Sequence, residues 1–246
     1  MPTATTTVTA EALSDDATSI LSLKAAKPTV AESSTAATLR SLYPRAAKAF
    51  LQRDFALTHS LVTSAFALVG PPTATVEDEL EVLRRKWDIL RITLEITVYT
   101  SPPPSEDALP APLRDNQTMS PSSLIQSLYT RSVQLFTPSA QAANPAYLPY
   151  QILYTLGSAG VKLGCGDMSR SFIEDWLARR VPDNNEQGRK GYAKVIELYC
   201  VHVLPRLEEW QYAEDFLQYE RELDSELREV RFHSLSPLRN SHNFSH

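Results

Sequence analysis

Histidine is the side chain best suited to acid–base catalysis or metal binding near neutral pH, and this sequence has five of them. His59 and His202 fall in segments with helical periodicity, whereas His233, His242 and His246 lie near the end of the chain. The one His-x-x-x-His spacing joins His242 to His246, outside any helical pattern, and no His-Glu-x-x-His occurs. The histidines therefore predict no metal site.

Other catalytic chemistries also lack their motifs. Neither Gly-x-x-x-x-Gly-Lys-Ser/Thr nor Gly-x-Gly-x-x-Gly, the loops that cradle phosphates, occurs in the sequence. Cys165 and Cys200 have no metal-ligand or Cys-x-x-Cys spacing, which favours buried thiols in a reducing compartment. An all-helical enzyme is an alternative, because catalytic groups can converge from distant positions, but it would require a polar pocket with strongly shifted pKa values. We expect a protein that is not an enzyme and has no cofactor.

The composition is that of a globular chain without a concentrated basic surface. Its 246 residues are 43% hydrophobic, which is enough for a sizeable core. The formal net charge of -5 gives no reason to expect a nucleic-acid partner. No basic start precedes an apolar run, as in a signal peptide, and no stretch approaches the roughly 18 to 20 apolar residues of a membrane-spanning helix. As given, the chain is expected to be soluble and intracellular.

A helical pattern that recurs three times indicates how the chain is organised. In each copy a large residue precedes a small residue by three positions, and a further residue follows three later: Phe55-x-x-Thr58-x-x-Leu61, Met168-x-x-Ser171-x-x-Glu174 and Trp210-x-x-Ala213-x-x-Phe216. This order is typical of the second helix of a stacked helix-turn-helix repeat, because the small residue lets a neighbouring helix approach closely. The predicted fold class is all-α, a tetratricopeptide-like stack of antiparallel helix pairs (an α-solenoid) with flexible termini.

Composition also divides the chain. Residues 1–36 are dominated by Thr, Ala and Ser and cannot bury enough apolar surface to offset the entropy of ordering, so we expect a disordered tail. Residues 37–232 form the predicted helical-repeat domain. Within it, residues 101–119 contain Pro102-Pro103-Pro104 and predict a mobile loop. Residues 233–246 are expected to form a polar C-terminal segment.

Local signals place the helices within this domain. Helical spacing of apolar residues begins at Leu39, and Pro44 is acceptable only near a helix start. Thr75 is expected to cap the next helix, along which an apolar stripe runs from Leu80 to Val98. The β-branched end of this segment also fits a strand, but the unbroken stripe favours a helix. Ser120-Pro121 predicts the cap and first residue of the next helix. Later helices are expected to begin at Asn144, Met168, Tyr192 and Trp210, the last of them continuing to about Arg231.

Two sets of residues resemble a known protein family. The first is Phe50-Leu51-x-x-Asp54-Phe55. The second comprises Phe172-Ile173-Glu174-Asp175-Trp176-Leu177, Gly191-Tyr192, Tyr199-x-x-x-Val203-Leu204-Pro205 and Glu209-x-x-x-Ala213-Glu214. In this order, and over about residues 38–220, the chain resembles the tail-anchored peroxisomal receptors of the peroxin twenty-six type, whose yeast counterpart is peroxin fifteen. The likeness rests on apolar and small residues, and the insert at 101–119 would be an elaboration typical of a fungal sequence.

The resemblance implies a docking function without chemistry. Members of that family display an all-helical cytosolic domain on the peroxisomal membrane and bind the N-terminal domains of peroxin six. They thereby recruit the AAA-ATPase of peroxins one and six, which extracts the ubiquitinated import receptor so that matrix-protein import continues. Such a receptor acts by raising the local concentration of the motor. A generic helical-repeat adaptor in another protein-targeting pathway is the alternative.

The family carries a C-terminal membrane anchor that is not visible in this sequence. The last residues run from Leu238 to His246, and Phe244 is the only large apolar residue after Asn240. We therefore expect either a chain truncated before the anchor or a soluble variant. The parent protein would lie on the cytosolic face of the peroxisomal membrane.

Partner contacts are expected on the first helix pair and the helix that follows it. Phe50, Leu51 and Phe55 are expected to maintain the shape of this pair, with Arg53 near its turn. Candidates for direct electrostatic contact are Arg84, Arg85 and Lys86. A run of this kind is more often the solvated flank of an amphipathic helix.

Overall fold

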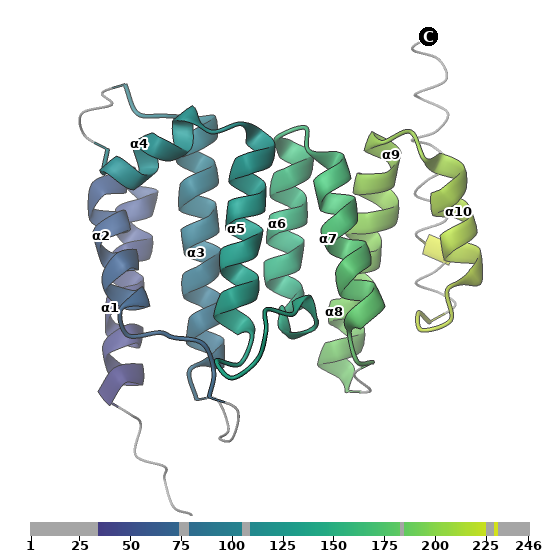
Figure 1. The fold of residues 1–246 in the computed structure, drawn as a ribbon, viewed down its shortest axis with the longest axis horizontal. Coiled ribbons are helices and arrows are strands. Elements are labelled where there is room, and N and C mark those ends of the chain that lie inside the picture. Colours follow the sequence, from purple (N-terminus) through teal and green to yellow (C-terminus); the bar gives the residue numbers. More distant parts are fainter. Residues whose placement is uncertain (1–33, 74–78, 105–108, 183–184, 225–228, 231–246) are drawn as a thin grey trace, which may run out of the picture. The chain divides into compact units, whose positions relative to one another are not determined.

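The computed structural model describes residues 34–73, 79–104, 109–182, 185–224 and 229–230, and the regular structure in these ranges is entirely helical (Figure 1). The all-α prediction is therefore confirmed. Residues 1–33 of the expected tail, the cap at Thr75 and the C-terminal segment 233–246 lie outside the described residues.

The elements follow one another along the chain as helices joined mostly by short turns. In order they are α1 (Ser34–Leu51), α2 (Phe55–Phe66), α3 (Glu81–Thr100), α4 (Ala111–Thr118), α5 (Pro121–Phe136), the 3-10 helix η2 (Pro145–Tyr147), α6 (Tyr150–Lys162), α7 (Gly166–Arg179), α8 (Glu186–Glu197), the π-helix η3 (Leu198–Val203), α9 (Leu204–Arg206) and α10 (Trp210–Tyr219).

Side chains before the first turn explain where several helices begin. Asp54 accepts a hydrogen bond from the Leu57 N–H at 2.9 Å and so caps α2. Ser120 accepts one from the Ser123 N–H at 3.1 Å, and Pro121 occupies the first position of α5, as predicted. At the turn between α6 and α7, Gly164 has a φ of 74°, which only glycine adopts at little cost.

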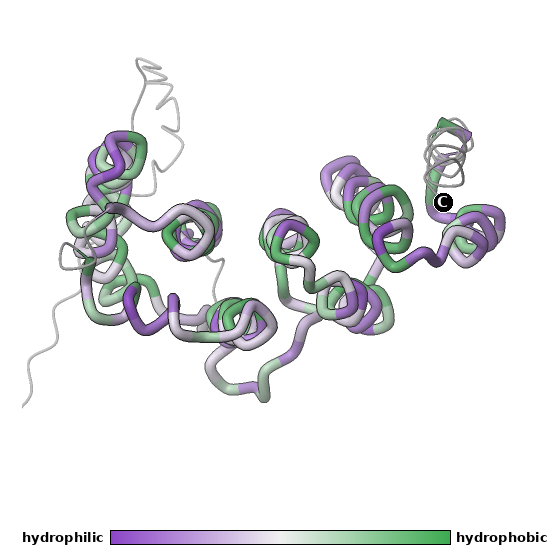
Figure 2. Tube along the Cα trace, turned by 90° about the horizontal axis from the view of Figure 1, so that it is seen from above, coloured by the Kyte–Doolittle hydropathy of each residue, from purple (hydrophilic) through white to green (hydrophobic). Residues whose placement is uncertain are grey.

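The helices of residues 34–224 pack in two rows. The first row comprises α1, α3, α6 and α8, each of which contacts the next. In the second row α2 packs on α1 and α3, α5 packs on α6, and α7 packs on α6 and η3. The view from above shows α3, α6 and α8 in one line, with α5 and α7 in another (Figure 2). Helices far apart in the sequence, such as α3 and α6, are thus direct neighbours.

The core of the described residues consists of three groups of buried apolar side chains. The N-terminal cluster joins α1, α2 and the first half of α3 around Trp87. The α4 cluster joins Leu113 of α4 to Leu94 of α3. The C-terminal cluster joins α5 to α10 and takes Ile92 and Ile96 from α3. Because α3 faces all three clusters, almost every side of this helix is covered by other elements.

Small residues mark the close helix contacts, although not all at the predicted positions. Thr58 and Ala213 are fully buried, as the recurring pattern requires. In the middle copy Ser171 is exposed, and Ser169 is the fully buried residue instead. A Cβ atom on Gly160 of α6 would lie 2.2 Å from the Ser169 hydroxyl of α7, so these two helices are as close as their side chains permit. In the middle copy, the buried small residue therefore lies two positions before the predicted one.

Two segments differ from the expected helix boundaries near the N-terminal half. Residues 111–118, predicted as loop, form α4, because Leu109 and Leu113 are buried in the α4 cluster and Pro112 suits the first turn of a helix. Pro44 lies in the interior of α1 rather than near its start. The helix tolerates it on an exposed face, where the ring meets solvent rather than core.

The end of the described chain also differs from prediction, because α10 stops at Tyr219 instead of continuing to about Arg231. Glu220 is extended and accepts a hydrogen bond from the Tyr192 hydroxyl at 2.5 Å. Arg180 lies over the ring of Tyr192, 4.0 Å from its centroid, and pairs with Glu222. We call these contacts the Arg180 clamp. They turn the chain so that Leu223 is buried in the C-terminal cluster.

Candidate binding site between α2, α3 and α5

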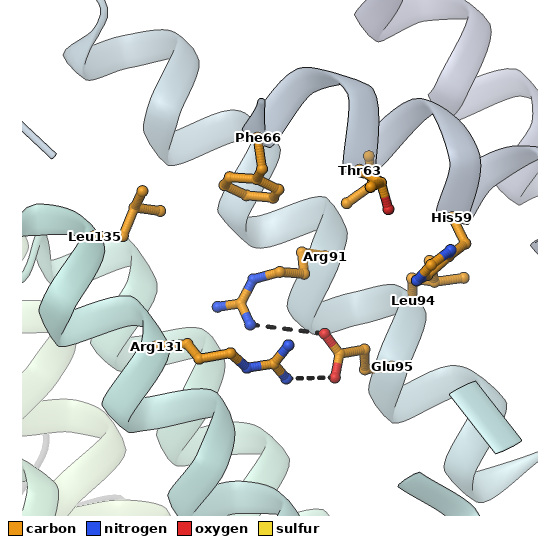
Figure 3. A pocket seen from close by; sticks show the side chains of 9 residues that line it. His59, Thr63, Phe66, Arg91, Leu94, Glu95, Arg131 and Leu135 are labelled. Carbon is orange, nitrogen blue, oxygen red and sulfur yellow. Dashed lines mark hydrogen bonds and ion pairs between the residues drawn. The ribbon is translucent and has the colours of Figure 1, made fainter. Parts of the chain in front are cut away.

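A cavity of about 300 Å³ lies between α2, α3 and α5 (Figure 3). It falls at the lower end of the range of ligand pockets. Its walls combine apolar side chains with two guanidinium groups, a carboxylate and an imidazole. The lining residues are His59, Val62, Thr63 and Phe66 of α2, Arg91, Leu94 and Glu95 of α3, and Arg131 and Leu135 of α5.

The helix α3 supplies an unusual set of buried charges behind and beside this cavity. Asp88 is fully buried, Arg91 is 8% exposed and Glu95 is 5% exposed. Their spacing of three and four residues puts them on one face of the helix. This face points toward α5, whereas neighbouring apolar residues of α3 enter the three core clusters. Buried charges require partners, and here the partners come from α3, α4 and α5.

The innermost partners join α3 to α5. Arg91 donates from Nε and Nη2 to Oδ1 of Asp88, at 2.9 and 2.6 Å. Nη2 also donates to the Ser132 hydroxyl at 3.0 Å. That hydroxyl in turn donates to Oδ2 of Asp88 at 2.7 Å. Ser132 therefore closes a ring of hydrogen bonds in which both charges are satisfied on the side away from the cavity.

The outer partners gather around Glu95. Its Oε2 accepts hydrogen bonds from Nη2 of Arg131 at 2.5 Å and from Nδ2 of Asn116 at 2.7 Å. Its Oε1 lies 3.6 Å from Nη1 of Arg91, which is an ion-pair contact too long for a hydrogen bond. Nη1 of Arg91 is buried and makes no hydrogen bond. Figure 3 shows the Glu95 carboxylate between the two guanidinium groups.

The other titratable group of the cavity lining is His59. Burial lowers the pKa of His59 below its ordinary value of 6.5, and the nearby Glu95 carboxylate partly opposes this shift. The imidazole is therefore neutral at pH 7. The ring of Phe66 lies 5.9 Å from the Arg91 guanidinium carbon and covers it with apolar surface.

This arrangement is suited to binding rather than to proton transfer. Arginine stays protonated and presents its N–H groups in a fixed plane. Arg91 is held in place by Asp88 and Ser132, so its orientation does not depend on a ligand. The structured part of the chain thus offers pre-oriented donors inside an apolar cavity, a combination that recognises a hydrogen-bond acceptor on an apolar body.

The first helix pair, expected to carry partner contacts, has both structural and exposed residues. Phe55 is buried, and Phe50 packs against it with ring centroids 6.4 Å apart, as expected for residues that maintain the pair. Arg53 has a φ of 59° at the turn and donates to the Ser101 carbonyl at 3.0 Å. Leu51, however, is 81% exposed. Such an exposed side chain does not fit the expectation that Leu51 maintains the shape of the pair.

The basic residues predicted for direct contact do not act as one group. Arg84 is buried, and its Nε donates to the Gly70 carbonyl at 2.9 Å, which ties α3 to the turn after α2. A direct electrostatic contact through Arg84 therefore does not fit this structure. Arg85 pairs with Glu81 one turn earlier on α3, at 3.8 Å. Lys86 is exposed.

None of the partner-binding residues predicted from the sequence lines the cavity, and the charged residues that do were not singled out. A signal was present in α3. Apolar residues occur on all sides of this helix, and Asp88, Arg91 and Glu95 fall among them at helical spacing. Charges on a helix without a solvated face must be buried and paired. Their partners on α5, Arg131 and Ser132, lie 36 to 44 residues away in sequence and could not have been chosen by spacing.

Several negative predictions can be compared with the described residues. Within them, no group of three or more His, Cys, Asp and Glu side chains is arranged to hold a metal ion. Across the same ranges, none of the helices combines the length and the apolar character needed to cross a membrane. Cys165 and Cys200 are buried thiols that are not joined in a disulfide, as expected.

Comparison with known proteins found no match to a family model, to a curated protein or to a solved structure.

Proposed function

We propose that this chain is a non-enzymatic helical-repeat adaptor, and specifically a peroxisomal membrane docking receptor. It recruits the AAA-ATPase of peroxins one and six for export of the matrix-protein import receptor, and its partner is the N-terminal domains of peroxin six. The chain itself contributes a rigid helical surface and no chemical step.

The proposal that the chain is an adaptor is supported by the close packing of consecutive helices at small residues. Thr58, Ser169 and Ala213 are fully buried on α2, α7 and α10, each in the second helix of a pair. The helices α1, α3, α6 and α8 contact one another in chain order. This is how a tetratricopeptide-like α-solenoid is built, and such arrays usually present binding surfaces.

The peroxisomal part rests on the resemblance described above and is supported by where its residues lie. Phe172, Ile173 and Trp176 of α7 and Ala213 of α10 are all buried in the C-terminal cluster. A shared pattern at these positions is a shared pattern of packing. It therefore favours the same helical domain, while the partner has to be tested directly.

The exposed end of the first helix pair is the best candidate for contact with peroxin six. Leu51 is almost fully solvent-exposed beside the Arg53 turn, whose conformation is fixed by the bond to Ser101. Burial of this exposed apolar side chain by a partner would favour binding.

A binding assay of the full chain against the purified N-terminal domains of peroxin six, with and without ATP-locked motor, tests this proposal. We expect saturable binding that Leu51→Asp weakens at least about tenfold, because a charge would have to be desolvated in the interface. The matched control is Leu68→Asp, at a half-exposed leucine beyond the other end of α2. Absence of binding by a folded chain would withdraw the peroxisomal assignment and leave a helical-repeat adaptor of another pathway.

A further inference from the structure

The cavity between α2, α3 and α5 offers more hydrogen-bond donors than acceptors. Arg91 is nine-tenths buried, and its Nη1 has no acceptor within hydrogen-bond distance. Arg131 is 44% exposed at the mouth of the cavity and uses one of its N–H groups on Glu95. The Glu95 Oε2 atom already accepts two hydrogen bonds, from Arg131 and Asn116. An unpaired buried donor is costly, so an acceptor that entered here would be stabilised.

The charged groups around the cavity are the second feature that bears on which ligand it can bind. Two guanidinium groups, Arg91 and Arg131, line it together with one carboxylate, Glu95. His59 is the other titratable group of the lining. Asp88 balances Arg91 from behind, through the edge of the guanidinium that faces Ser132, and is not part of the lining. With Asp88 the four charges already alternate and sum to zero, so an incoming carboxylate would be held by donor groups of Arg91 and Arg131 rather than by a net positive charge.

The remaining walls define the rest of the ligand. Val62, Phe66, Leu94 and Leu135 cover the cavity with apolar and aromatic surface. A small inorganic anion would leave these walls in contact with water, whereas a carboxylate on an apolar body would cover them as well.

We propose that this cavity binds a carboxylate next to a large apolar side chain, presented by a peptide segment of a partner protein. The carboxylate accepts hydrogen bonds from Arg131 and from Nη1 of Arg91, and the apolar side chain lies against Phe66 and Leu135. The partner as source rests on the proposed adaptor function, but the carboxylate chemistry does not depend on the partner being peroxin six.

The first test is a titration of the full chain with 4-phenylbutyrate, followed by NMR through the methyl signals of Leu94 and Leu135. We expect these signals to shift with 4-phenylbutyrate and to respond much less to 4-phenylbutyramide, which has the same shape without the charge. Arg131→Gln should weaken 4-phenylbutyrate binding about tenfold, since a charge-assisted hydrogen bond is lost. The matched control is Arg45→Gln, at an exposed arginine of α1 that does not line the cavity.

Arg131→Gln also removes a partner of the buried Glu95 and so destabilises the fold. A second variant therefore tests the cavity without breaking an ion pair. Thr63 is exposed on α2 at the edge of the cavity, so Thr63→Phe fills part of the space without touching the ion pairs. It should abolish the 4-phenylbutyrate shifts in a folded chain. Equal binding of acid and amide, or no shift with either, would overturn the proposal.

The second test uses the same variants in the binding assay with peroxin six. If the cavity receives a peptide of that partner, 4-phenylbutyrate and Thr63→Phe both reduce the amount bound. If binding to peroxin six is unaffected by both, the partner part of the inference is wrong. If peroxin six does not bind at all, the proposed function fails, and the NMR titration decides the carboxylate site by itself.

Discussion

Asp88 and Arg91 carry full charges in a part of the fold that solvent hardly reaches. Taking such charges out of water costs several kcal/mol per ion, and the cost is offset only when all hydrogen-bonding atoms are used. Ser132 meets part of this requirement, because its single hydroxyl donates to Asp88 and accepts from Arg91. The three residues therefore depend on one another. Removal of one should leave a buried charge without its partner, which lowers the free energy of unfolding.

The first prediction concerns Asp88→Ala, which leaves the Arg91 guanidinium buried without its principal acceptor. We expect the free energy of unfolding to fall by about 3 to 5 kcal/mol, the usual cost of breaking a buried ion pair. Urea denaturation followed by circular dichroism measures this change. The matched control, Asp115→Ala, removes an exposed carboxylate of α4 and should cost less than about 0.5 kcal/mol. Equal effects of the two substitutions would contradict the role assigned to Asp88.

The second prediction is a dependence of stability on pH through His59. Because burial depresses its pKa in the folded state, the unfolded chain binds a proton at a higher pH than the folded chain does. Neutral His59 makes its whole contribution to stability above pH 6.5. This contribution is lost as the pH falls from there through the folded-state pKa. Between about pH 7.5 and about pH 5.5, His59→Gln should therefore lose less stability than the unaltered chain. An identical pH profile for both proteins, measured by urea denaturation, would show that His59 is not the titrating group.

Sequence reasoning identified few of these residues, for a physical reason. The composition of α3 shows that the helix is buried on most sides, which makes its charges conspicuous. The bond partners Asn116, Arg131 and Ser132 lie on α4 and α5, and only the folded arrangement brings them to α3. Local spacing can therefore reveal that a charge needs a partner, but it cannot identify a partner from another helix.

At the scale of elements, α6 and α7 pack so closely that any residue larger than glycine at position 160 would collide with Ser169. The Ser169 hydroxyl of α7 donates to the Gly157 carbonyl of α6 at 2.9 Å and occupies the space where Gly160 would carry a Cβ atom. The missing side chain on α6 and the small side chain on α7 are thus complementary. Neither residue alone determines the distance between the helices.

The third prediction is a strong coupling between these two positions. Gly160→Ala should destabilise the protein by about 1 to 3 kcal/mol, because the added methyl group collides with Ser169. In a Ser169→Ala background the same substitution should cost at least about 1 kcal/mol less, since the nearest remaining atoms are the Cys165 carbonyl oxygen at 3.3 Å and the Cβ of residue 169 at 3.5 Å. The double-mutant cycle is measured by urea denaturation. Gly70→Ala is the control, because a Cβ atom there meets nothing within 4 Å. Additive effects at 160 and 169 would refute the contact.

At the level of elements, the sequence was informative where a helix end is determined locally. Ser120-Pro121 marked a real boundary, because a helix cap and the first helical turn depend on a few adjacent residues. By contrast, α4 was predicted as loop because its prolines suggested no regular structure, although Leu113 anchors it to another helix. The end of α10 was missed because Tyr192, on a distant helix, holds Glu220 out of helical geometry.

In the described chain as a whole, the charged network divides the apolar core. The N-terminal cluster contains Trp87, and the C-terminal cluster contains Trp176. Between α3 and α5, ion pairs and hydrogen bonds of Asp88 and Glu95 take the place of continuous apolar packing. In stacked repeats stability is approximately a sum of local terms and neighbour contacts, so a polar boundary weakens the coupling across it.

The fourth prediction is that the two sides of this boundary unfold at different urea concentrations. A variant with Trp87 as its only tryptophan reports on the N-terminal cluster, and a variant with Trp176 alone reports on the other. We expect a lower midpoint for Trp87, because its cluster buries fewer side chains. Circular dichroism of each variant serves as the control for damage caused by the substitutions. Coincident midpoints in both variants would mean that the boundary does not reduce cooperativity.

The Arg180 clamp has a mechanical consequence for a protein proposed to work beside a motor. A pull on the chain at Asp224 would reach Leu223, Glu222 and Glu220 before it reached α10. The load would pass through side chains to Tyr192 of α8 and to Arg180 at the end of α7. Tension is therefore shared between two helices of the stack, and it acts across several contacts at once instead of peeling one helix from its end.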